Sequence, residues 1–358
     1  MRILYLNCIE TNSGWGAENF LHKSFSQLGQ APYSVDYRKY RYQLLERTLK
    51  APESDVLFVQ KGDVVPLSLI GSVQRPRIFW ACDVLGTRPG QAIEDQDPVY
   101  DRTQYTLIKS RLFNHLFVRT HNCIETVVSR GWANRANCTI LSSGFDPEFH
   151  RPNPNVQKEI DVLFIGGMTQ RRRLIIDLVS KHVEVRTAAV YGSDMVKLFN
   201  RAKIVLNIHS GPLLDTETRI YETLGCGAFL LTERLSSENP FTAQDLVQFD
   251  SVDDLVGKIR YYLAHDQERE AIAAHGLRTA LNGHTYTHRA QEIIDVMSRY
   301  VSSHEGAARL MVKKGVGLYK YGLSEFKTRN TKRIRHKGSL LKTRGAHVAR
   351  KVLRRFAS

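Results

Sequence analysis

An arginine and a glutamate three positions apart carry the clearest chemistry in this sequence. On a helix, Arg219 and Glu222 lie one turn apart and project from the same face. A guanidinium binds phosphate with bidentate geometry, and a carboxylate can accept two hydrogen bonds from the diol of a ribose. The pair therefore predicts a nucleotide site, with a surface ion pair on an ordinary helix as the alternative.

The elements that would position this pair are a strand, a loop, a helix, a tight turn and a second strand. Residues 203–208 (KIVLNI) form an apolar run typical of a buried parallel strand, and residues 211–212 (GP) interrupt it. Residues 215–218 (DTET) offer caps for a helix N-terminus, and residues 225–227 (GCG) predict its end. A helix that begins at the carboxyl end of a parallel strand is a ready anion site.

The segment 216–233 (TETRIYETLGCGAFLLTE) resembles the signature of the CgeB-type, family 1-like glycosyltransferases. The residues that match this pattern are Arg219, Glu222, Cys226, Gly227 and Ala228, with Tyr221 in its aromatic slot. The resemblance covers about residues 1–300 and is strongest in the second half. It implies an α/β fold of the GT-B type, in which two Rossmann-like domains face a cleft and the second holds most of the nucleotide-sugar.

Composition and the resemblance together predict four parts of the chain. Residues 1–145 are expected to form an N-terminal Rossmann-like domain on the acceptor side, and residues 146–158, rich in proline and without periodicity, a linker. Residues 159–305 are expected to form the C-terminal nucleotide-sugar-binding domain with closing helices. Residues 306–358 form a basic tail.

An arginine run marks the start of a helix predicted over residues 168–181. Three cations at a helix N-terminus are unfavourable for the helix dipole, which suggests a use in binding a diphosphate; a solvated basic patch is the alternative. The predicted donor-binding residues are Gly166, Arg171, Arg172, Arg173, Asn207, His209, Thr218, Arg219 and Glu222.

The first half offers candidates for the acceptor side of the reaction. Asp83 ends a strand pattern and is the first candidate for a general base, although it could instead cap the following loop. His121 follows another strand end and is the second candidate, or a helix cap. Gly14, Trp15 and Gly16 follow the first strand, and we expect them to line the cleft unless they only form a tight turn.

The sequence predicts a metal-independent reaction with no cofactor besides the nucleotide-sugar as co-substrate. It contains no Asp-x-Asp motif, and Asp253 with Asp254 follows a serine in a pattern typical of a helix cap. The related retaining enzymes usually carry Glu-x7-Glu, but Leu214 stands eight positions before Glu222. The stereochemical outcome therefore stays open, and an inverting reaction would need one of the two candidate bases.

The charge of the chain is concentrated at its C-terminus. The sequence has 51 Lys and Arg against 36 Asp and Glu, and residues 306–358 hold 16 of the basic residues and one acid. Their apolar stripe consists of Leu341, Val348, Val352 and Phe356, flanked by Lys342, Arg344, Lys351 and Arg355. This pattern predicts a helix that binds an anionic membrane surface; a disordered end or a nucleic-acid arm is the alternative, and nucleic acid is not expected.

The overall prediction is a cytoplasmic glycosyltransferase, either free or peripheral on the inner face of the membrane. The sequence predicts no secretory or membrane-spanning segment, and the five cysteines are expected to be free thiols. It would move a sugar from a nucleotide-diphosphate-sugar to a hydroxyl of a glycan, lipid-linked or protein acceptor in surface glycan synthesis. A non-catalytic GT-B structural or coat protein and a sugar-nucleotide epimerase are the alternatives.

Overall fold

The computed structural model describes residues 1–12, 14–49, 51–62, 64–82, 99–210, 216–236 and 238–302. One compact unit, Met1–Val64 with Arg75–His304, holds two parallel β-sheets. Val65–Gln74, which contains the short helix α3 (Leu67–Ser72), belongs to a second unit. Among the described residues, no helix is long and apolar enough to cross a membrane.

The first sheet has six parallel strands in the order β2-β1-β3-β4-β5-β6. The strands are β1 (Arg2–Asn7), β2 (Ala31–Asp36), β3 (Val56–Gln60), β4 (Arg77–Trp80), β5 (His115–Val118) and β6 (Cys138–Ile140). Every residue of β3, β4 and β5 is buried, as expected for strands covered on both faces. The strand patterns that precede Asp83 and His121 in the sequence correspond to β4 and β5, and these predictions are confirmed.

The second sheet has five parallel strands in the order β11-β10-β9-β7-β8. The strands are β7 (Ile160–Ile165), β8 (Arg186–Ala188), β9 (Ala202–Asn207), β10 (Leu230–Glu233) and β11 (Val247–Phe249). The central strand β9 lies between β7 and β10, so the carboxyl ends of these three strands meet at one edge. That edge carries the candidate site.

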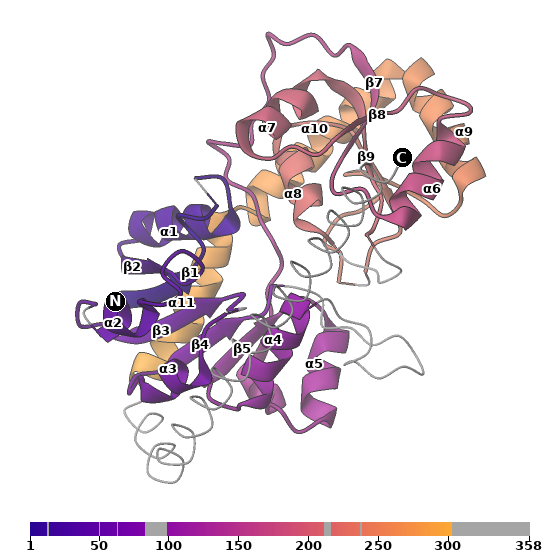
Figure 1. The fold of residues 1–358 in the computed structure, drawn as a ribbon. Helices are drawn as coiled ribbons and strands as arrows, with labels where there is room; N and C mark the ends of the chain where they lie inside the picture. Colours follow the sequence, from indigo (N-terminus) through magenta and orange to yellow (C-terminus); the bar gives the residue numbers. More distant parts are fainter. Residues whose placement is uncertain are drawn as a thin grey trace, which may run out of the picture. The chain divides into compact units, whose positions relative to one another are not determined.

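Helices connect the strands in the βαβ manner that a parallel sheet requires (Figure 1). The helices besides α3 are α1 (Ala17–Gln27), α2 (Leu44–Leu49), α4 (Val99–Lys109), α5 (His121–Ser129), α6 (Gln170–Val179), α7 (Gly192–Arg201), α8 (Thr218–Gly225), α9 (Val252–Ala264), α10 (Asp266–Gly283) and α11 (Tyr286–Ser302). The helix predicted over residues 168–181 is α6, which is shorter than expected at both ends. Thr169 caps its N-terminus, and Ser180 is the residue at its C-terminal cap position.

The last described helix returns to the first sheet. The buried face of α11 includes Tyr286, Ile293 and Met297, which share a core cluster with Tyr5 and Phe58 of that sheet. Figure 1 shows α11 alongside β1 and β3, far from them in sequence. A helix predicted to close the second half of the chain therefore completes the core of the first.

The end of α8 depends on glycine. A Cβ built on Gly225 would lie 2.3 Å from the ring of Phe145, so only glycine lets this buried ring approach the helix. Gly227 follows with φ +64°, the left-handed conformation that ends many helices. The predicted stop at these two residues is confirmed.

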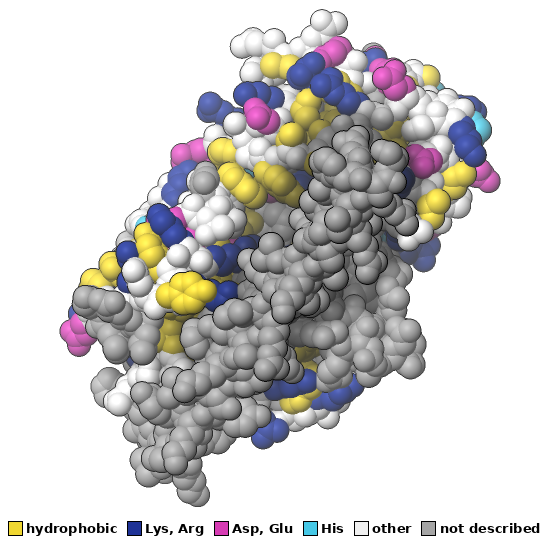
Figure 2. Space-filling model, viewed as in Figure 1, with side chains coloured by type: hydrophobic (Ala, Val, Ile, Leu, Met, Phe, Trp, Pro, Cys, Tyr) yellow, Lys and Arg dark blue, Asp and Glu magenta, His cyan; other side chains and the backbone are white. Residues whose placement is uncertain are grey.

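The described surface carries both signs of charge. Residues 1–305 contain 35 basic and 35 acidic residues, and on the face drawn in Figure 2 the described Lys, Arg, Asp and Glu side chains are interspersed. The five cysteines are free thiols, of which Cys8, Cys123 and Cys226 are buried. Burial raises the pKa of Cys8 to about 12, so this thiol stays protonated.

Candidate functional site

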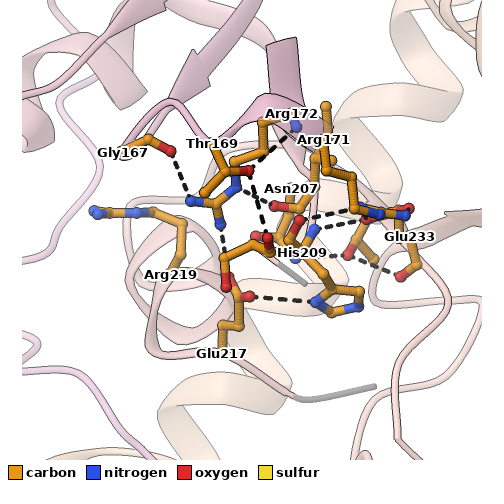
Figure 3. A network of polar contacts seen from close by, with 12 residues as sticks. Gly167, Thr169, Arg171, Arg172, Asn207, His209, Glu217, Arg219 and Glu233 are labelled. Atoms are coloured by element: carbon orange, nitrogen blue, oxygen red, sulfur yellow. Dashed lines mark hydrogen bonds and ion pairs between the residues drawn. The ribbon is translucent and has the colours of Figure 1, made fainter. Parts of the chain in front are cut away.

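The site is built from polar residues at the carboxyl ends of β7, β9 and β10 and at the starts of α6 and α8 (Figure 3). Parallel strands align their carboxyl ends at one edge, which is where ligands bind in open α/β sheets. Thr169 caps α6 by accepting a hydrogen bond from the Arg172 N–H at 3.3 Å. This cap fixes the turn from which the arginine run emerges.

Arg171 joins the start of α6 to the end of β10. Its guanidinium contacts both carboxylate oxygens of Glu233, with Nη1 2.9 Å from Oε2, and Nη1 also donates to the His209 carbonyl at 3.0 Å. The His209 N–H donates to Glu233 at 2.6 Å. The three residues form a closed network, so Arg171 is engaged by protein groups.

Arg172 turns into the site. Its Nε donates to the Ile208 carbonyl at 2.8 Å and its Nη1 to the Gly167 carbonyl at 2.9 Å, while Nη2 lies 3.6 Å from Glu217. Two backbone carbonyls thus hold the planar guanidinium in one orientation, with Nη2 at the start of α8. Arg173 is exposed instead. The arginine run therefore divides into two residues that point into the site and one on the surface.

His209 and Glu217 form an ion pair beside Arg172. The Nδ1 of His209 lies 3.3 Å from Glu217 Oε1, and its Nε2 donates to the Arg234 carbonyl at 2.9 Å. Burial alone would lower the pKa of His209, but these two hydrogen bonds outweigh it and raise the pKa. Burial would raise the pKa of Glu217, yet the contacts with His209 and Arg172 lower it. Both shifts therefore favour the charged forms of the two groups.

Arg219 and Glu222 lie one turn along α8, as the sequence predicted. Arg219 Nη1 donates to Glu222 Oε2 at 2.9 Å and also contacts the sulfur of Met195. The other carboxylate oxygen of Glu222 lies 3.8 Å from Nε2 of His150. Both side chains of the pair are only partly exposed, 16% and 14%, so this is not the surface ion pair of the alternative interpretation.

The N-terminus of α8 differs from the prediction. Thr216 and Thr218 were expected to offer caps, but the residue at the cap position is Glu217, whose side chain makes no capping hydrogen bond. The Thr216 hydroxyl contacts Ser236 at 3.2 Å, and the Thr218 hydroxyl contacts Ser143 at 2.8 Å. These tertiary partners divert both hydroxyls from capping. The loop with Leu214 and Asp215 lies outside the described residues.

Two other predicted donor residues have structural partners. The Asn207 side chain is buried and donates to the Thr232 hydroxyl at 3.0 Å, which links β9 to β10. The Gly166 N–H donates to the Ala188 carbonyl at 3.0 Å. A Cβ at Gly166 would lie 3.2 Å from the Phe164 ring, so glycine lets the backbone after β7 lie close to this ring.

The next residues are the two candidate bases predicted for the acceptor side. Asp83 lies outside the described residues. His121 is the first residue of α5 and is 61% exposed; its Nδ1 lies 3.3 Å from Glu238, and Thr120 rather than His121 caps the helix. Of the two candidate bases, the structure describes only His121, which lies at the start of α5 in contact with Glu238.

The predicted glycine loop has two distinct backbone roles. Gly14 has φ +83°, a left-handed conformation that favours glycine, and Gly16 is the residue at the cap position of α1. Between them, the Trp15 ring stacks on Tyr191 with centroids 5.0 Å apart. The loop is therefore ordered by an aromatic contact that the sequence did not predict.

Three contacts of the site were absent from the predictions. Glu233 ends β10 at the same edge, so the strand-end rule could have selected it. His150 was assigned to a linker, and nothing in its local pattern pointed to Glu222. Arg119 donates to the Thr216 carbonyl at 2.7 Å, just before α8. The last two partnerships join residues 72 and 97 positions apart and need the tertiary structure.

Comparison with known proteins supports the resemblance. Residues 157–295 match the family described as Glycosyl transferase-like. A comparison with curated protein sequences gave no significant match.

Solved structures share the fold over most of the chain. Two complexes of HepE from Anabaena, one with UDP and glucose and one with UDP-glucose, each give a TM-score of 0.62 at 14% identity over 84% of this chain and 100% of theirs. Sucrose-phosphate synthase from Thermosynechococcus elongatus gives 0.60 at 9% identity, over 84% and 99%. The BGT of phage T4 in complex with its UDP-glucose substrate gives 0.53 at 12% identity, over 84% and 99%.

At these identities the structural likeness establishes the fold, which is GT-B as the resemblance implied. The family match covers the second sheet and the candidate site residues on it, whereas Arg119 and His150 lie outside the matched range. Residues 157–295 thus match the glycosyl transferase-like family, and the chain has the GT-B fold.

Proposed function

We propose that this protein is a glycosyltransferase that uses a UDP-sugar as donor and transfers the sugar to an acceptor hydroxyl without a divalent metal. The observation that carries the proposal is the arrangement at the second sheet, where two arginines meet the start of α8, which has no side-chain cap among the described residues. The complexes of HepE and of phage T4 BGT with UDP or UDP-glucose support the choice of nucleotide.

The leaving diphosphate would be held by Arg172, Arg219 and the first N–H groups of α8. Those N–H groups need an acceptor, and the positive end of the helix dipole favours an anion. Arg172 has five N–H groups and its orientation is already fixed by two carbonyls. A preorganised guanidinium stabilises charge that develops on the diphosphate as the glycosidic bond breaks. Each such charged hydrogen bond contributes about 1.5–3 kcal/mol.

The ribose would be held by Glu222, in line with the resemblance. Its carboxylate has about four lone-pair positions, and Arg219 occupies one of them. The remaining positions suit two hydroxyls on adjacent carbons. His209, which follows β9, and its ion-pair partner Glu217 would then face the sugar.

Metal independence is tested directly by chelation. Because arginines and N–H groups would neutralise the diphosphate, turnover should survive excess EDTA. Activity that disappears with EDTA and returns with Mg²⁺ or Mn²⁺ would refute this part of the proposal.

The donor is tested with a panel of UDP-, GDP- and dTDP-sugars, with free nucleotide as the readout. We expect release of UDP to dominate and to increase with acceptor. Binding without release would favour a non-catalytic role, and interconversion of the sugar without transfer would favour an epimerase.

The proposal also includes the acceptor and the place in the cell where the enzyme acts. We propose a cytoplasmic enzyme that acts on a surface glycan or its lipid-linked precursor and is held at the membrane by residues 306–358, which lie outside the described residues. Their basic amphipathic pattern supports this. Co-sedimentation with anionic vesicles should be lost in a chain that ends near Glu305. Equal binding by both chains would exclude the anchor.

A further inference from the structure

The segment predicted as an irregular linker contains a rigid turn. Asp146 Oδ1 accepts hydrogen bonds from the N–H groups of Glu148 at 2.9 Å and Phe149 at 3.0 Å, and the His150 N–H donates to the Asp146 carbonyl at 2.7 Å. Lys23 contacts the second carboxylate oxygen of Asp146 at 2.8 Å. These contacts fix the backbone from which the His150 side chain extends.

The ring of His150 is enclosed by aromatic side chains. Its centroid lies 5.0 Å from Phe149, 5.4 Å from Phe20 and 6.4 Å from Phe145, and the side chain is fully buried. Its Nε2 has no hydrogen-bond partner among the described residues and lies 3.8 Å from Glu222 Oε1. A buried polar nitrogen is thus aimed at the carboxylate proposed to bind the ribose.

The ring carries one proton at neutral pH. Burial lowers the pKa of His150, although the nearby Glu222 carboxylate opposes this. Its Nδ1 lies 3.3 Å from both the N–H and the carbonyl of Asp146, so the turn permits either tautomer. The Glu222 carboxylate favours the tautomer with the proton on Nε2. In this tautomer the proton faces a negative charge, and Nδ1 accepts a hydrogen bond from the backbone N–H of Asp146.

We propose that His150 is a positioning residue for nucleotide binding. Its neutral ring presents Nε2–H to Oε1 of Glu222, while Arg219 holds Oε2 at 2.9 Å. When the donor binds, the 3.8 Å separation shortens to a hydrogen bond, and the carboxylate is fixed with its remaining lone pairs toward the ribose hydroxyls. This inference rests on the proposed function, since it assigns Glu222 to the ribose.

A positioning role and a packing role make opposite predictions for phenylalanine. A phenyl ring fits an aromatic cluster and removes an unsatisfied buried nitrogen, so His150→Phe should keep or raise the melting temperature. The substitution also removes the N–H group that donates a hydrogen bond to Glu222, so the Kd for UDP should rise by about tenfold, the scale of one charged hydrogen bond. If His150 served only packing, UDP affinity would follow stability.

The conservative control is His150→Gln, whose amide nitrogen replaces the donor at Nε2. Calorimetry with UDP should give a Kd close to that of the wild type for His150→Gln and a weaker one for His150→Phe. A folded His150→Phe protein that binds UDP as tightly as the wild type would overturn the inference.

Titration with 2′,3′-dideoxy-UDP separates this inference from the proposed function. Wild-type protein should prefer UDP to the analogue, and His150→Phe should lose most of that preference. A wild type without any preference overturns the ribose assignment and the inference with it. A preference that persists in His150→Phe overturns only the role of His150.

The tautomer provides a readout that does not depend on nucleotide. In ¹⁵N-labelled protein, the protonated and bare ring nitrogens of histidine have different shifts. We expect the proton of His150 on Nε2, and a proton on Nδ1 would overturn the inference.

Discussion

Replacing Glu222 by glutamine should weaken UDP binding while the fold persists. The side chain keeps its size and an oxygen for Arg219, whose Nη1 lies 2.9 Å from Oε2. The variant loses the charge and one acceptor atom, because an amide nitrogen cannot accept a hydrogen bond from a ribose hydroxyl. A hydrogen bond to a charged group is worth about 1.5–3 kcal/mol, and part of it survives at the amide oxygen, so the expected loss is about 1–3 kcal/mol.

In calorimetry this loss corresponds to a Kd for UDP that is about 5- to 140-fold higher. The matched control is Asp266→Asn, which neutralises the acid of another arginine–acid pair three positions apart, with Arg269 on α10. The control should bind UDP like the wild type. A Glu222→Gln protein with unchanged melting temperature and unchanged UDP affinity would refute the assignment of this carboxylate to the nucleotide.

Three further predictions use contrasts within the chain. Arg172→Met should weaken UDP binding by about 1.5–3 kcal/mol, because this guanidinium points into the site, whereas Arg173→Met on the surface should leave calorimetric affinity unchanged. Gly225→Ala should lower the free energy of unfolding in urea by about 1–3 kcal/mol, because its Cβ would meet a buried ring at 2.3 Å. By contrast, Gly257→Ala, with open space in the interior of α9, should raise it by about 0.5–1 kcal/mol. The pKa of His209 is raised in the folded state. The free energy of unfolding that its charge contributes is therefore complete below the unfolded pKa of about 6.5 and is lost as pH rises through the folded pKa. In urea titrations across this pH range, the free energy of unfolding of His209→Gln should lack this decrease.

Each contrast has an outcome that contradicts it. Equal losses for the two arginine variants would indicate a general charge effect. A Gly225→Ala protein as stable as the wild type would mean that the ring can move aside. A difference in stability between wild type and His209→Gln that does not change with pH would show that folding does not raise the pKa of this histidine.

Much of the fold could be read from local sequence. The apolar runs that became β5 and β9 are buried along nearly their whole length, so hydrophobicity and length alone identified them. The pairing of Arg219 with Glu222 was equally predictable, because a helix brings positions three apart together whatever surrounds it.

The predictions failed where a second partner lay far away in the chain. The hydroxyls of Thr216 and Thr218 resemble caps, but they bond to Ser236 and Ser143, so the start of α8 has no side-chain cap among the described residues. The capping preference of threonine describes only the hydrogen bonds that its hydroxyl can make to the neighbouring backbone. The competing tertiary partner becomes visible only when the chain is folded.

The sequence by itself determined the class of fold, the edge of the sheet that carries polar residues and the pairing of Arg219 with Glu222 on α8. Only the tertiary structure decided that Arg171 and Arg172 turn inward, and that His150 of the presumed linker faces Glu222. The physical reason is the range of the forces involved. Strand and helix patterns arise from neighbours within a turn or two, whereas a buried polar group takes whichever charged partner the packing brings within a few ångströms.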